Sequence, residues 1–91
     1  MKNIKENSFV KIDKNVRIAR FEKGAIVLHI QTFQYYFLDE YALFILDTVN
    51  EMSSVKNIIL AMKSAFEISS PENDVLFFLS FLLKKKIIKV Y

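Results

Sequence analysis

The sequence predicts an α+β domain of the winged helix-turn-helix class, with a three-stranded antiparallel sheet followed by three helices. Apolar residues between 16 and 38 alternate with a period of about two, as in strands that bury one face. From residue 39 the apolar period changes to about 3.6, which is typical of amphipathic helices. A run of strands followed by a run of helices, joined by short loops, favours an α+β domain over a parallel sheet.

The first fifteen residues are expected to form a loose, basic N-terminal arm, and the folded domain is expected to span 16–91. Residues 1–15 are mostly polar and include four lysines, although Phe9, Val10 and Ile12 offer some apolar attachment. The polar start has no apolar run of the kind found in a signal peptide.

Strands are expected over 16–21, 25–30 and 33–38. The turn at 22–24 contains the chain's one glycine, Gly24, where a positive φ is expected. Residues 31–32 are expected to form a short hairpin connection. The third strand is apolar on both faces: Phe33, Tyr35 and Phe37 on one, and Gln34, Tyr36 and Leu38 on the other. Such a strand is either covered on both sides or shows one face to a partner, and an open aromatic edge invites pairing.

Helices are expected from Asp39, a good N-cap, to about 51, from 53–54 to about 66, and from about 71 to 86. On a helical wheel, one arc of the third helix is expected to be core: Val75, Phe78, Leu79, Leu82 and Leu83. Phe77 and Phe81 fall on the other side, where a surface helix is normally polar. Two alternatives remain open: another element, the hairpin or the basic arm, covers these rings, or a partner does.

The residue types argue against an enzyme, a metal site or a bound cofactor. There is no cysteine, which excludes disulfides, thiolate metal ligands and cysteine nucleophiles. The single histidine, His29, is expected to be structural or to lie on the surface, and no Gly-rich phosphate loop or nucleophile motif is present. The longest apolar run, 75–83, is about half of what a membrane-spanning helix needs. We therefore expect a cytoplasmic protein that is not associated with a membrane.

The charge distribution bears on a second candidate function, a winged-helix DNA-binding regulator. The formal net charge is +3, but both ends are basic and the middle is acidic. The second helix offers few base-reading side chains, and both arginines, Arg17 and Arg20, lie in the first strand. We therefore expect no nucleic-acid partner. The lysines 84–86 stabilise a helix C-terminus through its dipole, or attract an acidic peptide.

Short motifs follow one another in a characteristic order. They are Tyr36-Phe37-Leu38-Asp39, the helix start at 54–59, Asp74-Val75 followed by Phe78-Leu79 and Leu82, and the pair Ile87-Ile88. From about residue 16 to 88 the chain resembles the PqqD-like domains of natural product biosynthesis, also called RiPP recognition elements. It departs from the family in two places: Asp39 stands at the usual Asn position, and the Gly common after the first helix is absent.

The resemblance implies non-catalytic binding of the leader segment of a precursor peptide, presented to a separate modifying enzyme or leader peptidase. In the family the leader adds as a β-strand to the third strand, here 33–38, in a groove with the third helix, here 71–86. The peptide-binding residues expected on this basis are Phe33, Gln34, Tyr35, Tyr36, Phe37, Phe77, Phe81, Lys84 and Lys85. A homodimer through the unpaired third strand remains an alternative use of that edge.

Overall fold

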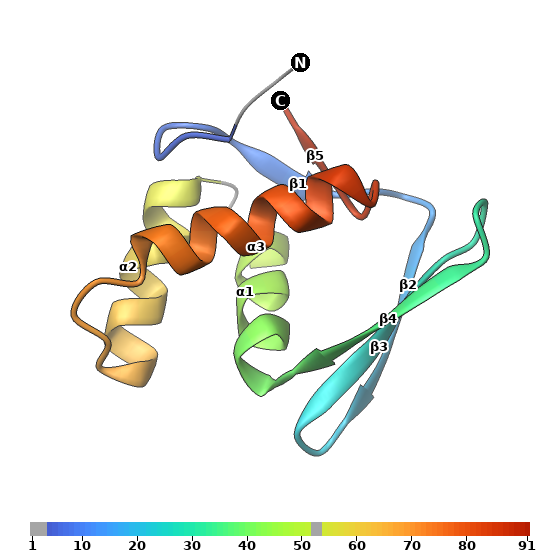
Figure 1. The fold of residues 1–91 in the computed structure, drawn as a ribbon, viewed down its shortest axis with the longest axis horizontal. Helices are drawn as coiled ribbons and strands as arrows, with labels where there is room; N and C mark the ends of the chain where they lie inside the picture. The colour runs from blue at the N-terminus through green and yellow to red at the C-terminus, as the bar shows by residue number, and fades with distance from the viewer. Residues whose placement is uncertain (1–3, 52–53) are drawn as a thin grey trace.

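The computed structural model describes residues 4–51 and 54–91. The elements in chain order are β1 (Val10–Ile12), β2 (Val16–Phe21), β3 (Gly24–His29), β4 (Gln34–Asp39), α1 (Glu40–Glu51), α2 (Val55–Phe66), α3 (Glu72–Lys84) and β5 (Ile88–Val90). The antiparallel sheet β2-β3-β4 precedes the three helices, so the predicted α+β fold is confirmed. Figure 1 shows the helices gathered beside the sheet, whose two hairpin turns project away from them.

The core lies between the helices and one face of the sheet. Along β3, Ala25, Val27 and His29 are buried, while Ile26 and Leu28 are partly exposed on the opposite face. Besides Ala25 and Val27 of β3, fully buried side chains come from every helix and from both ends of the fold, among them Val10, Leu46, Val55, Ile58, Val75, Leu79, Leu82 and Ile87. On the other face of the sheet the side chains of Tyr35 and Phe37 are largely exposed.

The expectation of a positive φ at Gly24 is wrong, because this glycine does not have a positive φ. Glycine is needed here for another reason. Gly24 is the first residue of β3 and lies opposite Asp39 of β4. A Cβ at this position would approach the carbonyl oxygen of Leu38 to 2.4 Å. The close approach of two backbones, rather than the turn itself, therefore requires glycine here.

The β3–β4 connection is longer than the two residues expected at 31–32. Phe33 is part of the turn, with φ of 58°, and its N–H donates to the carbonyl oxygen of His29 at 2.9 Å. The buried imidazole of His29 accepts from the backbone N–H groups of Gln31 at 3.3 Å and Thr32 at 3.4 Å. His29 therefore has a structural role in shaping the turn, and β4 begins at Gln34 instead of residue 33.

The expectation of a loose N-terminal arm is wrong for its described part, residues 4–15. Val10–Ile12 form β1, which pairs antiparallel with β5 at the other end of the chain, and Val10 is fully buried. The backbone N–H of Asp13 also donates to the carbonyl oxygen of Ile87 at 2.8 Å. The two ends of the chain consequently form a second, two-stranded sheet (Figure 1).

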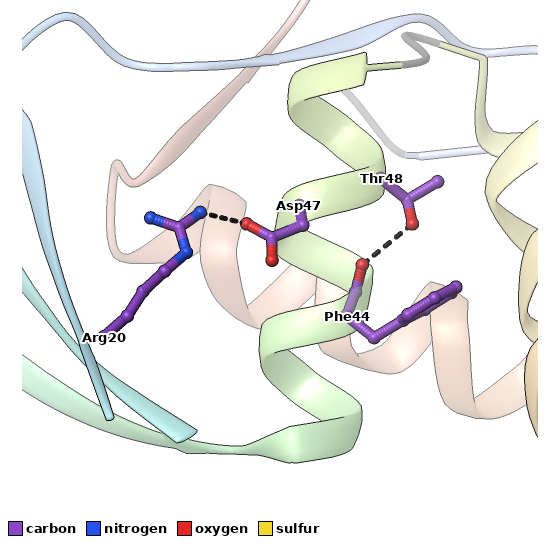
Figure 2. A network of polar contacts seen from close by, with 4 residues as sticks. All are labelled: Arg20, Phe44, Asp47 and Thr48. Carbon is purple, nitrogen blue, oxygen red and sulfur yellow. Dashed lines mark hydrogen bonds and ion pairs between the residues drawn. The ribbon is translucent and has the colours of Figure 1, made fainter. Parts of the chain in front are cut away.

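Polar contacts fix the start of α1 and attach it to the sheet. Asp39 caps α1 as predicted, because its Oδ1 accepts from the N–H of Ala42 at 2.9 Å. Figure 2 shows the guanidinium of Arg20, on β2, paired with the carboxylate of Asp47 in the middle of α1. This ion pair is largely exposed and contributes at most about 1 kcal/mol, but it links the outer strand of the sheet to a helix.

The third helix ends two residues earlier than expected, at Lys84. Lys86 has φ of 62°, and the N–H groups of Lys86 and Ile87 donate to the carbonyl oxygens of Leu83 at 3.1 Å and Leu82 at 2.9 Å. This is the hydrogen-bond pattern of a Schellman C-cap, with lysine in the left-handed position that glycine usually occupies. No helix of residues 4–51 and 54–91 is long and apolar enough to cross a bilayer.

Candidate functional site

Two adjoining hollows lie between β4 and α3, and we call them together the β4–α3 groove. The larger, of about 530 Å³, is lined by Tyr35, Tyr36, Phe37, Leu38 and Asp39 of β4, Ala42 of α1, and Phe77, Phe78 and Phe81 of α3. The smaller, of about 400 Å³, is lined by Phe33, Gln34, Tyr35, Tyr36 and Lys85. Because both hollows share Tyr35 and Tyr36, the groove runs along the whole of β4.

The floor of the groove is a cluster of aromatic rings. Tyr36 and Phe81 meet edge to face with their centroids 5.7 Å apart, and Phe78 stacks beside Phe81 at 6.3 Å. The hydroxyl of Tyr36 donates to Oε1 of Gln34 at 2.6 Å, so its polar end is satisfied within the strand. A ligand in this groove would therefore meet an apolar surface whose rings already pack against one another.

The rim of the groove is the open edge of β4, whose only pairing partner among the described strands is β3. A two-residue turn follows Phe21, so Phe21 and Gly24 form a hydrogen-bonded pair. Because hydrogen-bonded pairs alternate along an antiparallel ladder, the backbone groups of residues 24, 26 and 28 bond to β2, and those of residues 25, 27 and 29 bond to β4. The latter three face 38, 36 and 34 in β4. The backbone groups of Tyr35 and Phe37 are therefore the ones that point away from the sheet.

Comparison with known proteins identifies a family. The family model described as coenzyme PQQ synthesis protein D (PqqD) matches residues 24–88.

The chain belongs to the PqqD family.

Among solved structures, "TbiB1 in Complex with the TbiA(beta) Leader Peptide" is similar, with a TM-score of 0.82 and 28% sequence identity over 89% of this chain and 96% of that chain. No curated protein matches this sequence. The resemblance to PqqD-like RiPP recognition elements that the sequence motifs indicated is confirmed. The match covers β3, β4 and all three helices, and so includes both walls of the groove.

On the helical side of the β4–α3 groove, Phe77 is 79% exposed, whereas Leu79 and Leu82 are fully buried. The expected separation of core and off-core faces is thus confirmed for Phe77. It is only partly right for Phe81, which is half-buried against the core and Tyr36. Phe78, expected in the core, is also half-buried and lines the groove.

The aromatic stripe of β4 borders the groove, but its side chains lie on the outer face of the sheet. Tyr35 is 70% exposed and Phe37 is 69% exposed, and Phe37 stacks on Phe21 of β2 at 6.3 Å. They alternate with Tyr36, which packs against α3, and so point the other way. Phe33, in the turn, is 81% exposed. Tyr35 and Phe37 therefore offer the groove backbone hydrogen-bonding groups, while the inward ring belongs to Tyr36.

The lysines at the end of α3 differ in position. The ammonium of Lys85 lies 5.9 Å from the ring centroids of both Tyr36 and Phe81, and its side chain is half-buried at one end of the groove. Lys84 is exposed and lines neither hollow. Of the two lysines predicted as binding residues, the structure brings Lys85 to the groove and leaves Lys84 outside it.

The lining is completed by residues that the sequence did not predict as peptide-binding residues: Leu38, Asp39, Ala42 and Phe78. Ala42, on the first turn of α1, takes part because α1 begins directly after β4. No local pattern reveals such neighbours, because they depend on how α1 and α3 are set against β4.

The carboxylates with shifted pKa values lie outside this groove. The N–H of Asn15 donates to Asp13 at 2.8 Å and holds the pKa of that carboxyl below its ordinary value, helped by Lys89. The ammonium of Lys63, 2.9 Å from Oε1 of Glu72, lowers the pKa of that exposed glutamate. In residues 4–51 and 54–91 no three potential metal ligands cluster. The residues that line the groove can offer a ligand hydrogen bonds, apolar contact and the charges of Asp39 and Lys85.

Proposed function

We propose that this PqqD-family domain binds the leader segment of a precursor peptide in the β4–α3 groove, without catalysing a reaction on it. The observation that carries the proposal is an unpaired strand edge directly beside an apolar groove of about 530 Å³. The similar structure of TbiB1 contains a leader peptide, which supports the same class of ligand here.

The proposed mode of binding is strand addition. The N–H and C=O groups of Tyr35 and Phe37 would bond to the backbone of an extended peptide, which thereby becomes the fourth strand of the sheet. Backbone bonds of this kind hold any sequence, so selectivity comes from the alternate side chains that enter the groove. On the groove side these side chains would meet Tyr36, Phe78 and Phe81.

Strand addition would also allow the domain to present the precursor peptide to a separate enzyme. Only a few residues of the peptide are needed to cover the six residues of β4, so the rest of the precursor extends beyond the domain. A modifying enzyme or leader peptidase would act on that extended part. The domain itself would contribute affinity and position, which requires no catalytic group.

The test is a pair of substitutions at Tyr35, with peptides selected from a display library of random linear 14-residue sequences as probes. Tyr35→Pro removes an outward N–H and leaves the β3 ladder intact, so we expect a native circular dichroism spectrum and an affinity loss of tenfold or more. Tyr35→Ala is the matched control: it removes the ring but keeps the N–H, and should bind. Selection of no peptides, or normal binding by Tyr35→Pro, would contradict the proposal.

A further inference from the structure

We infer that the peptide held in the β4–α3 groove carries an acidic side chain that pairs with Lys85, with large apolar side chains two and four positions away. This inference rests on the proposed function and adds the chemistry that the groove selects. It comes from the distribution of charge along α3 and β4.

One stripe of α3 faces the groove, and its charge changes sign from end to end. Phe77, Phe78 and Phe81 occupy the middle, and Lys85 follows one turn after Phe81. Asp74 precedes Phe77 by one turn and so begins the same stripe. The helix and its C-cap residue Lys85 therefore present a carboxylate, three rings and an ammonium in that order.

Lys85 has no anionic partner within the described part of the chain. The ion pairs found there are Arg20–Asp47, Lys63–Glu72 and Lys89–Asp13. The hollow around Lys85 is lined by aromatic and amide side chains and contains no acid. The rings of Tyr36 and Phe81 attract the ammonium weakly and also exclude water from it, so a carboxylate there would be bound more strongly than at an open surface.

The helix dipole does not remove this positive charge. The C-terminus of α3 carries the equivalent of about half a negative charge. Three consecutive lysines, at 84–86, lie at that end, so the local field remains positive. Dipole stabilisation would explain a lysine anywhere on the last turn, but it does not explain why Lys85 lies over the groove rings while Lys84 points elsewhere.

The opposite end of the groove is acidic, which fixes the register of a charged peptide. Asp39 lines the larger hollow, and one of its oxygens caps α1, which leaves the other as an acceptor. Asp74 is exposed at the same end of the α3 stripe. An acidic peptide side chain would be repelled there and attracted to Lys85, so charge and apolar contact together select one position along β4.

The spacing follows from the rise per residue of the two elements. Phe77 and Lys85 are eight residues apart on the helix, which is roughly 12 Å at 1.5 Å per residue. An extended peptide covers that distance in about four residues at roughly 3.3 Å each. Because alternate side chains of a strand share a face, positions two and four from the acidic residue also enter the groove, over Tyr36–Phe81 and beside Phe77.

The experiment repeats the random 14-residue selection against the wild-type protein and against Lys85→Glu. We expect the wild-type set to share an Asp or Glu two and four positions from large apolar residues, and the Lys85→Glu set to carry Lys or Arg at that place. For one wild-type peptide, changing its acidic residue to the amide should weaken binding by about tenfold or more.

Lys85→Met and Lys84→Met separate local pairing from general charge attraction. Lys85→Met should weaken binding of the acidic peptide by about tenfold and should bind the amide version as well as the acidic one. Lys84→Met, which removes the same charge outside the groove, should change the affinity less than about threefold. Selected peptides without an acidic preference would overturn this inference and leave the proposed function standing. Failure to select any peptide would overturn both.

Discussion

The exposed ring of Phe77 and the buried side chain of Leu82 lie on opposite faces of α3, so their substitutions should have opposite effects. Leu82 is fully buried, and Leu82→Ala should cost about 2–5 kcal/mol of unfolding free energy. A domain of this size typically has an unfolding free energy of only about 5–10 kcal/mol. For a chain of this size each kcal/mol is worth about 4–8 °C in Tm, so we expect a fall of about 10 °C or more.

Phe77 is 79% exposed, so about one fifth of its surface is buried. For a ring of roughly 200 Å² this is about 40 Å², worth about 1 kcal/mol at 25 cal/mol per Å². The higher helix propensity of alanine returns roughly 0.5 kcal/mol. Phe77→Ala should therefore lower the Tm by no more than about 4 °C.

Peptide affinity should fall more in Phe77→Ala than in Leu82→Ala. A ring at the rim of the groove that packs on the peptide can contribute 2 kcal/mol or more, which is about thirtyfold in Kd. The assays are a thermal melt followed by circular dichroism and a fluorescence anisotropy titration, at a temperature where both variants are folded. If Phe77→Ala melted at as low a temperature as Leu82→Ala, the exposure argument would be refuted. An unchanged affinity would show that Phe77 does not contact the peptide.

Further predictions concern stability. Because the N–H of Asn15 lowers the pKa of Asp13, this carboxylate contributes stability above about pH 4. That stability is lost as the pH falls through the lowered pKa of the folded state. The unfolding free energy measured in urea should therefore differ less between pH 7 and pH 3 in Asp13→Asn than in the wild type. Gly24→Ala should cost more than about 1 kcal/mol in the same assay, because its Cβ meets the carbonyl oxygen of Leu38. Lys86→Gly should instead raise the Tm, because it relieves about 1 kcal/mol of left-handed backbone strain.

The elements that have their own periodicity could be predicted from the sequence. β2 spans the residues expected from alternation, and α1 begins where Asp39 predicted a cap. The pairing of β1 with β5 could not be predicted, because each strand has three residues and its partner lies at the other end of the chain. Short segments of this kind acquire their structure from tertiary pairing rather than from local pattern.

The position of a groove residue could be predicted from the sequence only where a single helix or strand determines it. The helical wheel separates Phe77 from Leu82 without knowledge of the sheet. The half-burial of Phe81 depends on contact with Tyr36, and so on the angle at which α3 crosses β4. Likewise, which β4 backbone groups face outward depends on the two-residue length of the β2–β3 turn, which was expected to include Gly24.

The sheet formed by the chain ends offers a physical reason why β4 can stay open. An unpaired apolar edge contributes little to stability and risks association with other strands. In this small domain the closing contacts come from β1, β5 and the residue just before β5, because Val10, Ile87 and Ile88 are almost completely buried. Those residues extend the core away from the groove, so that Phe77 and the edge of β4 need not be buried for the chain to fold. The segment expected to be a loose arm thus contributes a core residue, Val10, that does not line the groove.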